Sequence, residues 1–286
     1  MKPLIAFIAY FSIYFSMSAI TPQSMMRFHC AEDTTEINTI LAETNNRSDI
    51  KSLTLDLAKH FIGRKYMPKT LEADKEYLTI NIHEFDCVTF VESIIALTQT
   101  AQRSHTTWRD YAQHLESIRY RKGSMNGYGS RLHYISDWIA DNTYRGNIKE
   151  ITQNFEGVTT MTKTLNYMSR NADKYSALED STNLAEIKKV EMGYRSHLIP
   201  YLKKQFLAKK SVCQQLKDGD IVVILSKTEG LDASHVGFIA LIDDVPHLLH
   251  ASTLNHKIEL EQIDLNEYLK RHARNAPGVR ILRIVQ

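Results

Sequence analysis

Residues 86–97, DCVTFVESIIAL, constrain the fold more than any other stretch of the chain. Apolar residues recur there at helical spacing and cover a broad face, which predicts a helix packed on several sides at the centre of the molecule. Asp86 is a suitable N-cap residue, because its carboxylate can accept hydrogen bonds from the unpaired N–H groups of the first turn. Cys87 then occupies the first helical position.

Cys87 has two interpretations. A buried cysteine commonly does no more than fill space in a core. On the first turn of a helix, however, unpaired N–H groups and the helix dipole favour the thiolate form, which is a nucleophile. The charge of Asp86 opposes a thiolate, so we expect a positively charged partner, such as a protonated histidine, to tip the balance.

The rest of the chain predicts an α+β fold with an antiparallel sheet. Helical patterns begin near Ser52 and dominate residues 106–210, which we expect to form a helical insertion. The last third instead contains short apolar runs rich in β-branched residues, separated by turn formers. These runs are DIVVILS, SHVGFIALI, VPHLLHAST, KIELEQI and VRILRIV.

The N-terminus predicts export. Lys2 precedes an apolar run that ends in small residues near Ser18, as in a signal peptide spanning residues 1–19. The alternative is an uncleaved membrane anchor, because the run approaches the length of a spanning helix. We expect residues 20–50 to be an N-terminal extension, residues 51–286 to be a single domain, and the protein to be periplasmic or secreted.

The net charge limits the classes of binding partner, and the number of cysteines limits the possible disulfides. The 286 residues carry a formal net charge of +2 without a dominant basic block, so no nucleic-acid partner is expected. Of the three cysteines, Cys30 and Cys213 are candidates for a disulfide that leaves Cys87 free. The sequence does not indicate an oligomeric state.

Two histidines are placed so that they could assist Cys87. His235 begins one predicted strand and His250 lies in the next, with DDVP between the strands. If residue 242 pairs with 245 or 247, His250 is an even number of positions from the partner of His235, so both rings point to one face. A bulge would break this relation, and a lone strand histidine is commonly structural. Together the three residues predict a nucleophile, a base and an orienting group.

Metal binding is the rival use of cysteine and histidine. The chain has no Cys-x-x-Cys and no His-Glu-x-x-His, the close-spaced pairs typical of zinc sites. We therefore expect no metal and no other cofactor.

Three motifs carry a resemblance to a known family. FDCVTFVE, SHVGFIAL and LLHAST resemble the core motifs of NlpC-type cell-wall hydrolases, which are papain-like cysteine enzymes. Further stretches, GRKYMPKTLE, YRKGSMNGYGSRLHYISDWIADN and GLDASHVG, resemble the N-acetylmuramoyl-L-alanine amidase-like branch, and the resemblance covers the chain from about residue 52 onward. It implies a papain-like NlpC-type fold in which Cys87 attacks, His235 is the base and His250 orients the base.

The resemblance also implies a substrate. The branch hydrolyses the amide between N-acetylmuramic acid and the L-alanine of the peptidoglycan stem peptide, so muropeptides are the expected partners. Many relatives instead cut within the stem after D-glutamate and use the Asp of Asp-Cys to bind a free amine. Two roles are therefore open for Asp86, a helix cap or a substrate contact. We expect the Cys87 N–H and the Tyr66 hydroxyl to meet the oxyanion.

Residues 130–138, SRLHYISDW, are further candidates for gripping a sugar and an acidic peptide. The alternative is a helix start with two aromatics in the core and charges in solvent. The candidate substrate-binding residues of this segment are Arg131, Tyr134, Asp137 and Trp138.

Three other functions remain open at this stage: a stem-peptide endopeptidase, a papain-like acyltransferase, and a non-catalytic muropeptide-binding protein. A binding protein would be expected to lose at least one of the three catalytic residues. An acyltransferase would need an apolar acceptor groove.

Overall fold

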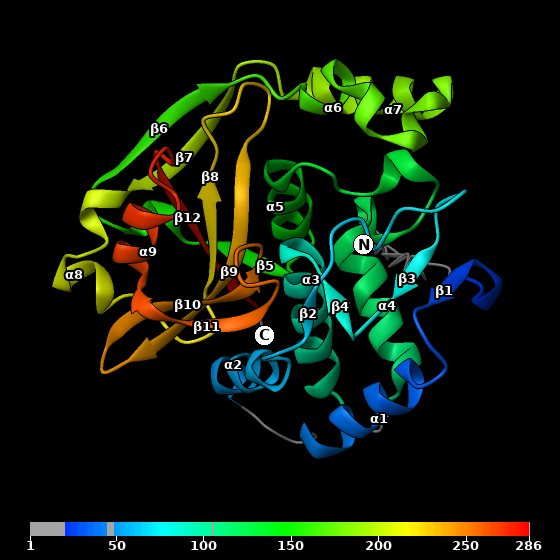
Figure 1. Ribbon diagram of the computed structural model, residues 1–286, viewed down its shortest axis with the longest axis horizontal. Coiled ribbons are helices and arrows are strands. Elements are labelled where there is room, and N and C mark those ends of the chain that lie inside the picture. The colour runs from blue at the N-terminus through cyan, green and yellow to red at the C-terminus, as the bar shows by residue number, and fades with distance from the viewer. Residues whose placement is uncertain (1–20, 45–48, 105, 286) are drawn as a thin grey trace, which may run out of the picture.

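The computed structural model describes residues 21–44, 49–104 and 106–285 (Figure 1). The predicted signal peptide at residues 1–19 lies outside these residues. Within them, no helix is both long and apolar enough to cross a membrane. The helices are α1 Asp33–Thr44, α2 Ile50–His60, α3 Cys87–Ala101, α4 Trp108–Arg119, α5 Ile135–Tyr144, α6 Tyr167–Arg170, α7 Ser181–Gly193, α8 Lys210–Cys213 and α9 Leu265–Arg271. The strands are β1 Met26–Phe28, β2 Lys65–Tyr66, β3 Leu78–Ile80, β4 Glu84–Phe85, β5 Ile148–Glu150, β6 Val158–Lys163, β7 His197–Lys203, β8 Ile221–Leu225, β9 Ala233–Ile242, β10 Val245–Ser252, β11 Lys257–Asp264 and β12 Gly278–Ile284.

A ten-stranded sheet forms one side of the molecule. Its order is β4-β2-β11-β10-β9-β8-β12-β7-β6, with β5 paired to β12. Adjacent strands of this sheet are antiparallel except for β2 and β4, which are parallel. The sheet was expected to be antiparallel, and it is mixed at this edge. The α+β prediction is confirmed in this coarser form, as helices packed on a mixed sheet.

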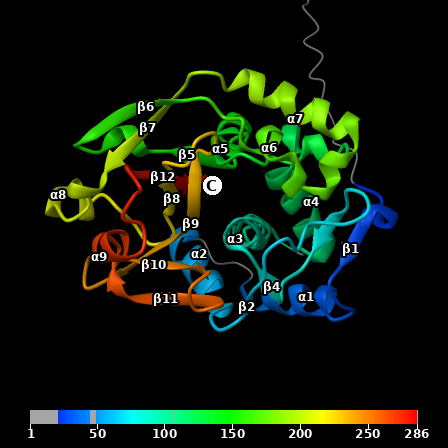
Figure 2. The same cartoon turned by 45° about the horizontal axis from the view of Figure 1, so that its top comes forward.

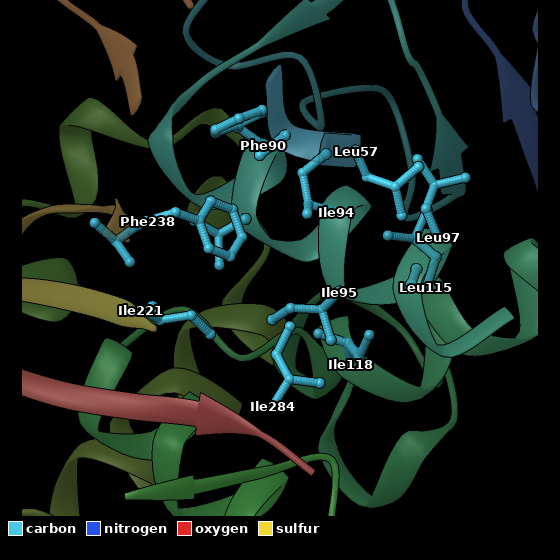
Figure 3. Close-up of a cluster of buried hydrophobic side chains, with 14 of the residues drawn as sticks. Leu57, Phe90, Ile94, Ile95, Leu97, Leu115, Ile118, Ile221, Phe238 and Ile284 are labelled. Carbon is cyan, nitrogen blue, oxygen red and sulfur yellow. The ribbon is translucent and has the colours of Figure 1, made fainter. Parts of the chain in front are cut away.

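Helix α3 is buried between the sheet and the other helices. It packs on β9 and β10 on one side and on α4 on the other, and it also contacts α2 (Figure 2). Figure 3 shows the centre of this packing, where Ile94 and Ile95 lie between side chains of both layers. Phe90 meets Phe238 of β9 edge-on, with ring centroids 5.8 Å apart. The predicted central helix is therefore confirmed.

The edge of the sheet leads directly into α3. Strand β4 ends at Phe85, one residue before the cap of the helix, and pairs with β2. Strand β2 in turn pairs with β11 through Lys65 and Lys257. Because β4 is short and anchored, the first turn of α3 starts at a defined place against the sheet.

The segment before α2 also packs against this region. Residues Ile37, Ile40 and Leu41 of α1 belong to the same apolar core as α3. Strand β1 pairs in parallel with β3. Helix α1, Asp33–Thr44, lies within the predicted N-terminal extension.

The predicted helical insertion at 106–210 is only partly helical. It contains α4, α5, α6 and α7, but β6 and β7 form an antiparallel pair that extends the sheet. The helical structure expected up to residue 210 is wrong beyond Gly193, where α7 ends and His197–Lys203 forms a strand. Pro200 lies in that strand, and a proline in a helix interior removes a hydrogen bond and clashes with the preceding turn.

A buried ion pair ties α3 to α4. Arg119 donates from Nε to Oε2 of Glu92 at 2.7 Å, and both side chains are 2% exposed. The guanidinium also donates to the carbonyl of Thr79 in β3 at 2.8 Å. Burial raises the pKa of Glu92, and the charge of Arg119 opposes that rise.

Replacing Arg119 with methionine should lower the free energy of unfolding by about 3–5 kcal/mol, because Glu92 is left buried without its cation. Denaturant unfolding followed by circular dichroism measures this loss. Lys209→Met is the matched control, since its ion pair with Glu156 is exposed, and it should leave stability essentially unchanged. Equal losses in the two variants would contradict the assignment.

Candidate active site

Cys87 is the first residue of α3, and Asp86 caps the helix. The Oδ1 atom of Asp86 accepts hydrogen bonds from the N–H groups of Val88 and Thr89 at 3.0 and 2.8 Å. Thr89 completes a capping box by accepting from the Asp86 N–H at 2.9 Å. This cap holds the thiol of Cys87 in place at the end of a rigid helix.

The two predicted histidines lie on adjacent strands in the expected register. In the hairpin of β9 and β10, Ile242 pairs with Val245 and Phe238 pairs with Leu249. This register places His250 two positions from the partner of His235. The rings are on one face, with Nε2 of His235 only 2.6 Å from Nδ1 of His250. The predicted juxtaposition is therefore confirmed.

The carboxylate of Glu261 extends the pair of His235 and His250, and it was not among the residues predicted from the sequence. Oε1 of Glu261, on β11, lies 3.0 Å from Nε2 of His250, whose side chain is buried. A carboxylate can only accept, so His250 donates from Nε2 and its Nδ1 is an acceptor. His235 then donates from Nε2, which leaves its Nδ1 unprotonated and free to act as a base. The alternating pattern of KIELEQI put Glu261 in a strand, but no motif marked it.

Gly237 provides the space in which His250 sits. A Cβ atom at Gly237 would lie 2.9 Å from Cβ of His250 and 2.9 Å from the carbonyl oxygen of Leu249. Side chains do not approach backbone so closely, so a larger residue here would push β10 away. The glycine two residues after His235 thus has a packing role.

The thiol and the first histidine are both neutral in the resting protein. Burial, followed by the charge of Asp86, raises the pKa of Cys87 to about 12, although N–H groups of Val236, Cys87 and Val88 oppose the rise. Burial and the nearby His250 lower the pKa of His235 to about 3. The sequence analysis expected a stabilised thiolate with a protonated histidine. The structure differs because loss of hydration outweighs the helix terminus.

Cys87 and His235 line one open pocket of about 710 Å³. Strand β9 lies against the start of α3. The backbone N–H of Val236, the residue after His235, therefore reaches the Cys87 thiol and opposes the rise in its pKa. Part of the pocket lining is basic and comes from the loop after β8 and from α9 and the residues after it. The basic lining residues are Lys227, Arg271, His272 and Arg274.

Tyr66, the predicted oxyanion contact, also lines this pocket. Burial and the charges of Cys87 and Asp86 raise the pKa of its hydroxyl to about 12, so it remains a hydrogen-bond donor. Asp86 acts as the helix cap, one of the two roles left open by the sequence. A substrate contact by Asp86 stays a prediction.

The other four candidate substrate-binding residues do not line the Cys87 pocket, and their side chains contact other residues of the protein. Arg131 pairs with Glu72 at 2.9 Å and lines a separate small pocket with it. Asp137 accepts two hydrogen bonds from Arg121, at 2.8 and 2.6 Å.

The two aromatic candidates of this segment are core residues. The hydroxyl of Tyr134 donates to Glu191 at 2.7 Å, and Trp138 is 2% exposed. Residues 130–138 therefore follow the alternative interpretation, a helix start with two aromatic residues in the core. They differ from it in one respect, because Arg131 and Asp137 are buried in ion pairs and are not exposed to solvent. None of these four residues lines the pocket of Cys87.

All three cysteines are unpaired, so the suggested bridge between Cys30 and Cys213 is wrong. Cys30 precedes α1 and Cys213 ends α8. The thiol of Cys213 donates to the carbonyl of Leu207, whereas Cys30 faces His83.

Comparison with known proteins identifies relatives over most of the chain. The profile of the AmiA-like family, described as N-acetylmuramoyl-L-alanine amidase-like, matches residues 56–278. No curated protein sequence matched.

Solved structures share the fold. An N-acetylmuramoyl-L-alanine amidase from Bacteroides uniformis is 34% identical, with a TM-score of 0.77, and the match covers 83% of this chain and 99% of that one. A protein from Bacteroides fragilis described as a putative xylanase is 36% identical, covering 80% and 100% at a TM-score of 0.75. A Legionella pneumophila protein at 20% identity, covering 89% and 95%, has a TM-score of 0.72 and shows the fold alone.

Alkylation of Cys87 by iodoacetamide should accelerate continuously as the pH rises from 6 to 10, because the pKa of the thiol is about 12 and the thiolate is the reactive form. Peptide mass spectrometry resolves the three cysteines. The chain unfolded in denaturant is the control, where Cys87 should follow an ordinary thiol pKa of about 8.5. A plateau of fast alkylation below pH 7 would instead reveal a preformed ion pair with His235.

Proposed function

This chain belongs to the AmiA-like, N-acetylmuramoyl-L-alanine amidase-like family of peptidoglycan hydrolases, and from this premise we propose that Cys87 is the nucleophile of a cell-wall amidase. The bond cleaved is the amide between the lactyl group of N-acetylmuramic acid and the L-alanine of the stem peptide. The observation that carries this proposal is the hydrogen-bonded series from Glu261 through His250 to His235, which ends at the pocket of Cys87.

The first step forms an acyl-enzyme. Nδ1 of His235 takes the thiol proton as the sulfur of Cys87 attacks the lactyl carbonyl, so charge develops only when substrate is in place. The N–H of Cys87 and the Tyr66 hydroxyl stabilise the oxyanion. His235 then gives the proton to the departing L-alanine amine, and the C–N bond breaks to leave a thioester.

The second step returns the enzyme to its resting state. His235 takes a proton from water, the resulting hydroxide attacks the thioester, and Cys87 leaves with the proton from His235. During both steps the imidazolium of His235 is stabilised through His250 by the carboxylate of Glu261. This arrangement offsets the cost of charging a buried histidine.

The pocket chemistry supports a muropeptide substrate. Stem peptides carry carboxylates, and the basic wall that includes Lys227, Arg271 and Arg274 offers cations to bind them. The position of Cys87 at the start of a helix, packed on a sheet that carries the histidines, supports a papain-like NlpC-type architecture. Peptidoglycan lies outside the cytoplasmic membrane, so the proposal includes export through residues 1–19 to the periplasm or the exterior.

Glycoside hydrolysis is disfavoured by the same pocket. Most glycosidases need a pair of carboxyl groups flanking the bond that they cut. In the described part of the chain, the residues that line the Cys87 pocket include no aspartate and no glutamate.

Incubation with an anhydro-muramyl tetrapeptide should release an intact peptide that begins with L-alanine, together with the free sugar, as measured by mass spectrometry. Cys87→Ala should abolish turnover and remain folded, because it removes the nucleophile from a helix end held by other contacts. The free stem peptide is the second substrate. Cleavage of the stem after D-glutamate would favour an endopeptidase, and wild-type activity in Cys87→Ala would refute the mechanism.

Replacing Glu261 with glutamine should lower kcat by about 10-fold or more with little change in KM, because the imidazolium loses its carboxylate. The pKa of His235 should fall further, which moves the acidic limb of the pH profile of kcat/KM to lower pH. Glu259→Gln is the matched control. It removes the same charge from β11 opposite His250, while the hydrogen bond of Glu261 remains. Equal effects would show a general electrostatic role only.

A further inference from the structure

A second cluster of reactive side chains lies apart from the pocket of Cys87. It joins the N-terminal segment, through Cys30 and Asp33, to the loop between β3 and β4, through His83. Cys30 Sγ lies 3.2 Å from Nε2 of His83, and the same nitrogen lies 3.5 Å from Oδ1 of Asp33. One donor atom from each of these three residues lies within 4.8 Å of the others.

The separations of 3.2 and 3.5 Å match the edges of a metal coordination shell. Zinc binds sulfur at about 2.3 Å and nitrogen or oxygen at about 2.0–2.2 Å, so tetrahedral donors lie about 3.3–3.6 Å apart. Cysteine, histidine and aspartate are the residue types that zinc prefers. One ion between the three donors would replace these polar contacts with metal–ligand bonds.

The charge around the cluster favours a cation. The side chain of Asp33 is fully buried, and Oε2 of Glu36 lies 3.6 Å from Nε2 of His83. Arg64 pairs with the other oxygen of Glu36. The carboxylate of Asp33 accepts from the N–H groups of Cys30 and Ile82, at 2.9 and 3.4 Å, and lies beside His83.

We propose that Cys30, Asp33 and His83 bind one divalent transition-metal ion, with Zn²⁺ as the best match, and that the fourth position is open to solvent beside Glu36. The side chain of His83 is 31% exposed, which gives the ion a route of entry. The expectation of no metal rested on the absence of close-spaced ligand pairs in the sequence. Here the tertiary structure brings together donors that are 53 positions apart.

The role of this metal would be structural. His83 immediately precedes β4, which leads into Asp86 and Cys87. An ion held by these ligands would fasten the N-terminal segment to the strand that positions the nucleophile. It lies outside the reaction itself, so the inference does not depend on the amidase proposal.

Cobalt binding tests the site directly. A variant with Cys87→Ala and Cys213→Ser keeps Cys30 as its one thiol, so a thiolate-to-Co²⁺ charge-transfer band can come from no other residue. The protein is stripped with a chelator, titrated with Co²⁺, and then titrated with Zn²⁺. We expect one equivalent of Co²⁺, bleaching of the band by Zn²⁺, and a rise in Tm of about 4 °C or more when Zn²⁺ is 100-fold above its Kd.

Two further substitutions identify the ligands. Adding Cys30→Ser should abolish the band, and adding His83→Gln should weaken Co²⁺ binding about 10-fold or more. His60→Gln, on the exposed side of α2, is the matched control and should change nothing. Cooperative thermal unfolding of the metal-free variants shows that they are folded. The absence of a band and of a Tm shift, or a band unaffected by His83→Gln, would overturn the proposal.

Discussion

The burial of α3 between the sheet and α2 and α4 is the constraint on which the rest of the structure depends. An apolar helix with a broad hydrophobic face cannot remain at a surface, so strands and helices must cover it on several sides. The first turn of this helix is the one place where its backbone N–H groups need external partners. Asp86 supplies them, and the thiol of Cys87 is thereby fixed at the boundary between the core and the pocket.

The same burial keeps the thiol of Cys87 protonated. Asp86 stabilises the helix but places a negative charge next to Cys87, and desolvation adds to its effect on the thiol pKa. His235 is subject to the opposite shift. Charge separation between Cys87 and His235 is therefore unfavourable in the free protein. In the proposed mechanism, the hydrogen-bonded series through His250 to Glu261 offsets the charge that His235 gains when substrate binds. A neutral resting thiol also reacts slowly with oxidants, since oxidation follows thiolate character.

Some features had no reliable signal in the sequence. The strands β6 and β7 lie in a region of helical composition, and their pairing across more than 30 residues decided their structure. Glu261 reaches His250 because β11 lies beside β10, which periodicity does not report. Arg131 and Asp137 have the composition of a binding segment, but neighbouring charged residues bury and neutralise them. A list of polar residues does not distinguish an internal ion pair from a substrate contact.

Local chemistry sufficed for several parts of the molecule. The amphipathic pattern and the cap at Asp86 determine α3, because capping and helix periodicity involve residues within one or two turns. The short loop between β9 and β10 determines that His235 and His250 share a face, since a hairpin register follows from its turn. The tertiary structure alone decided the protonation of Cys87, the contact of Glu261, and the meeting of Cys30 with His83. Each of these depends on desolvation or on contacts between distant segments, which arise only when the chain has packed.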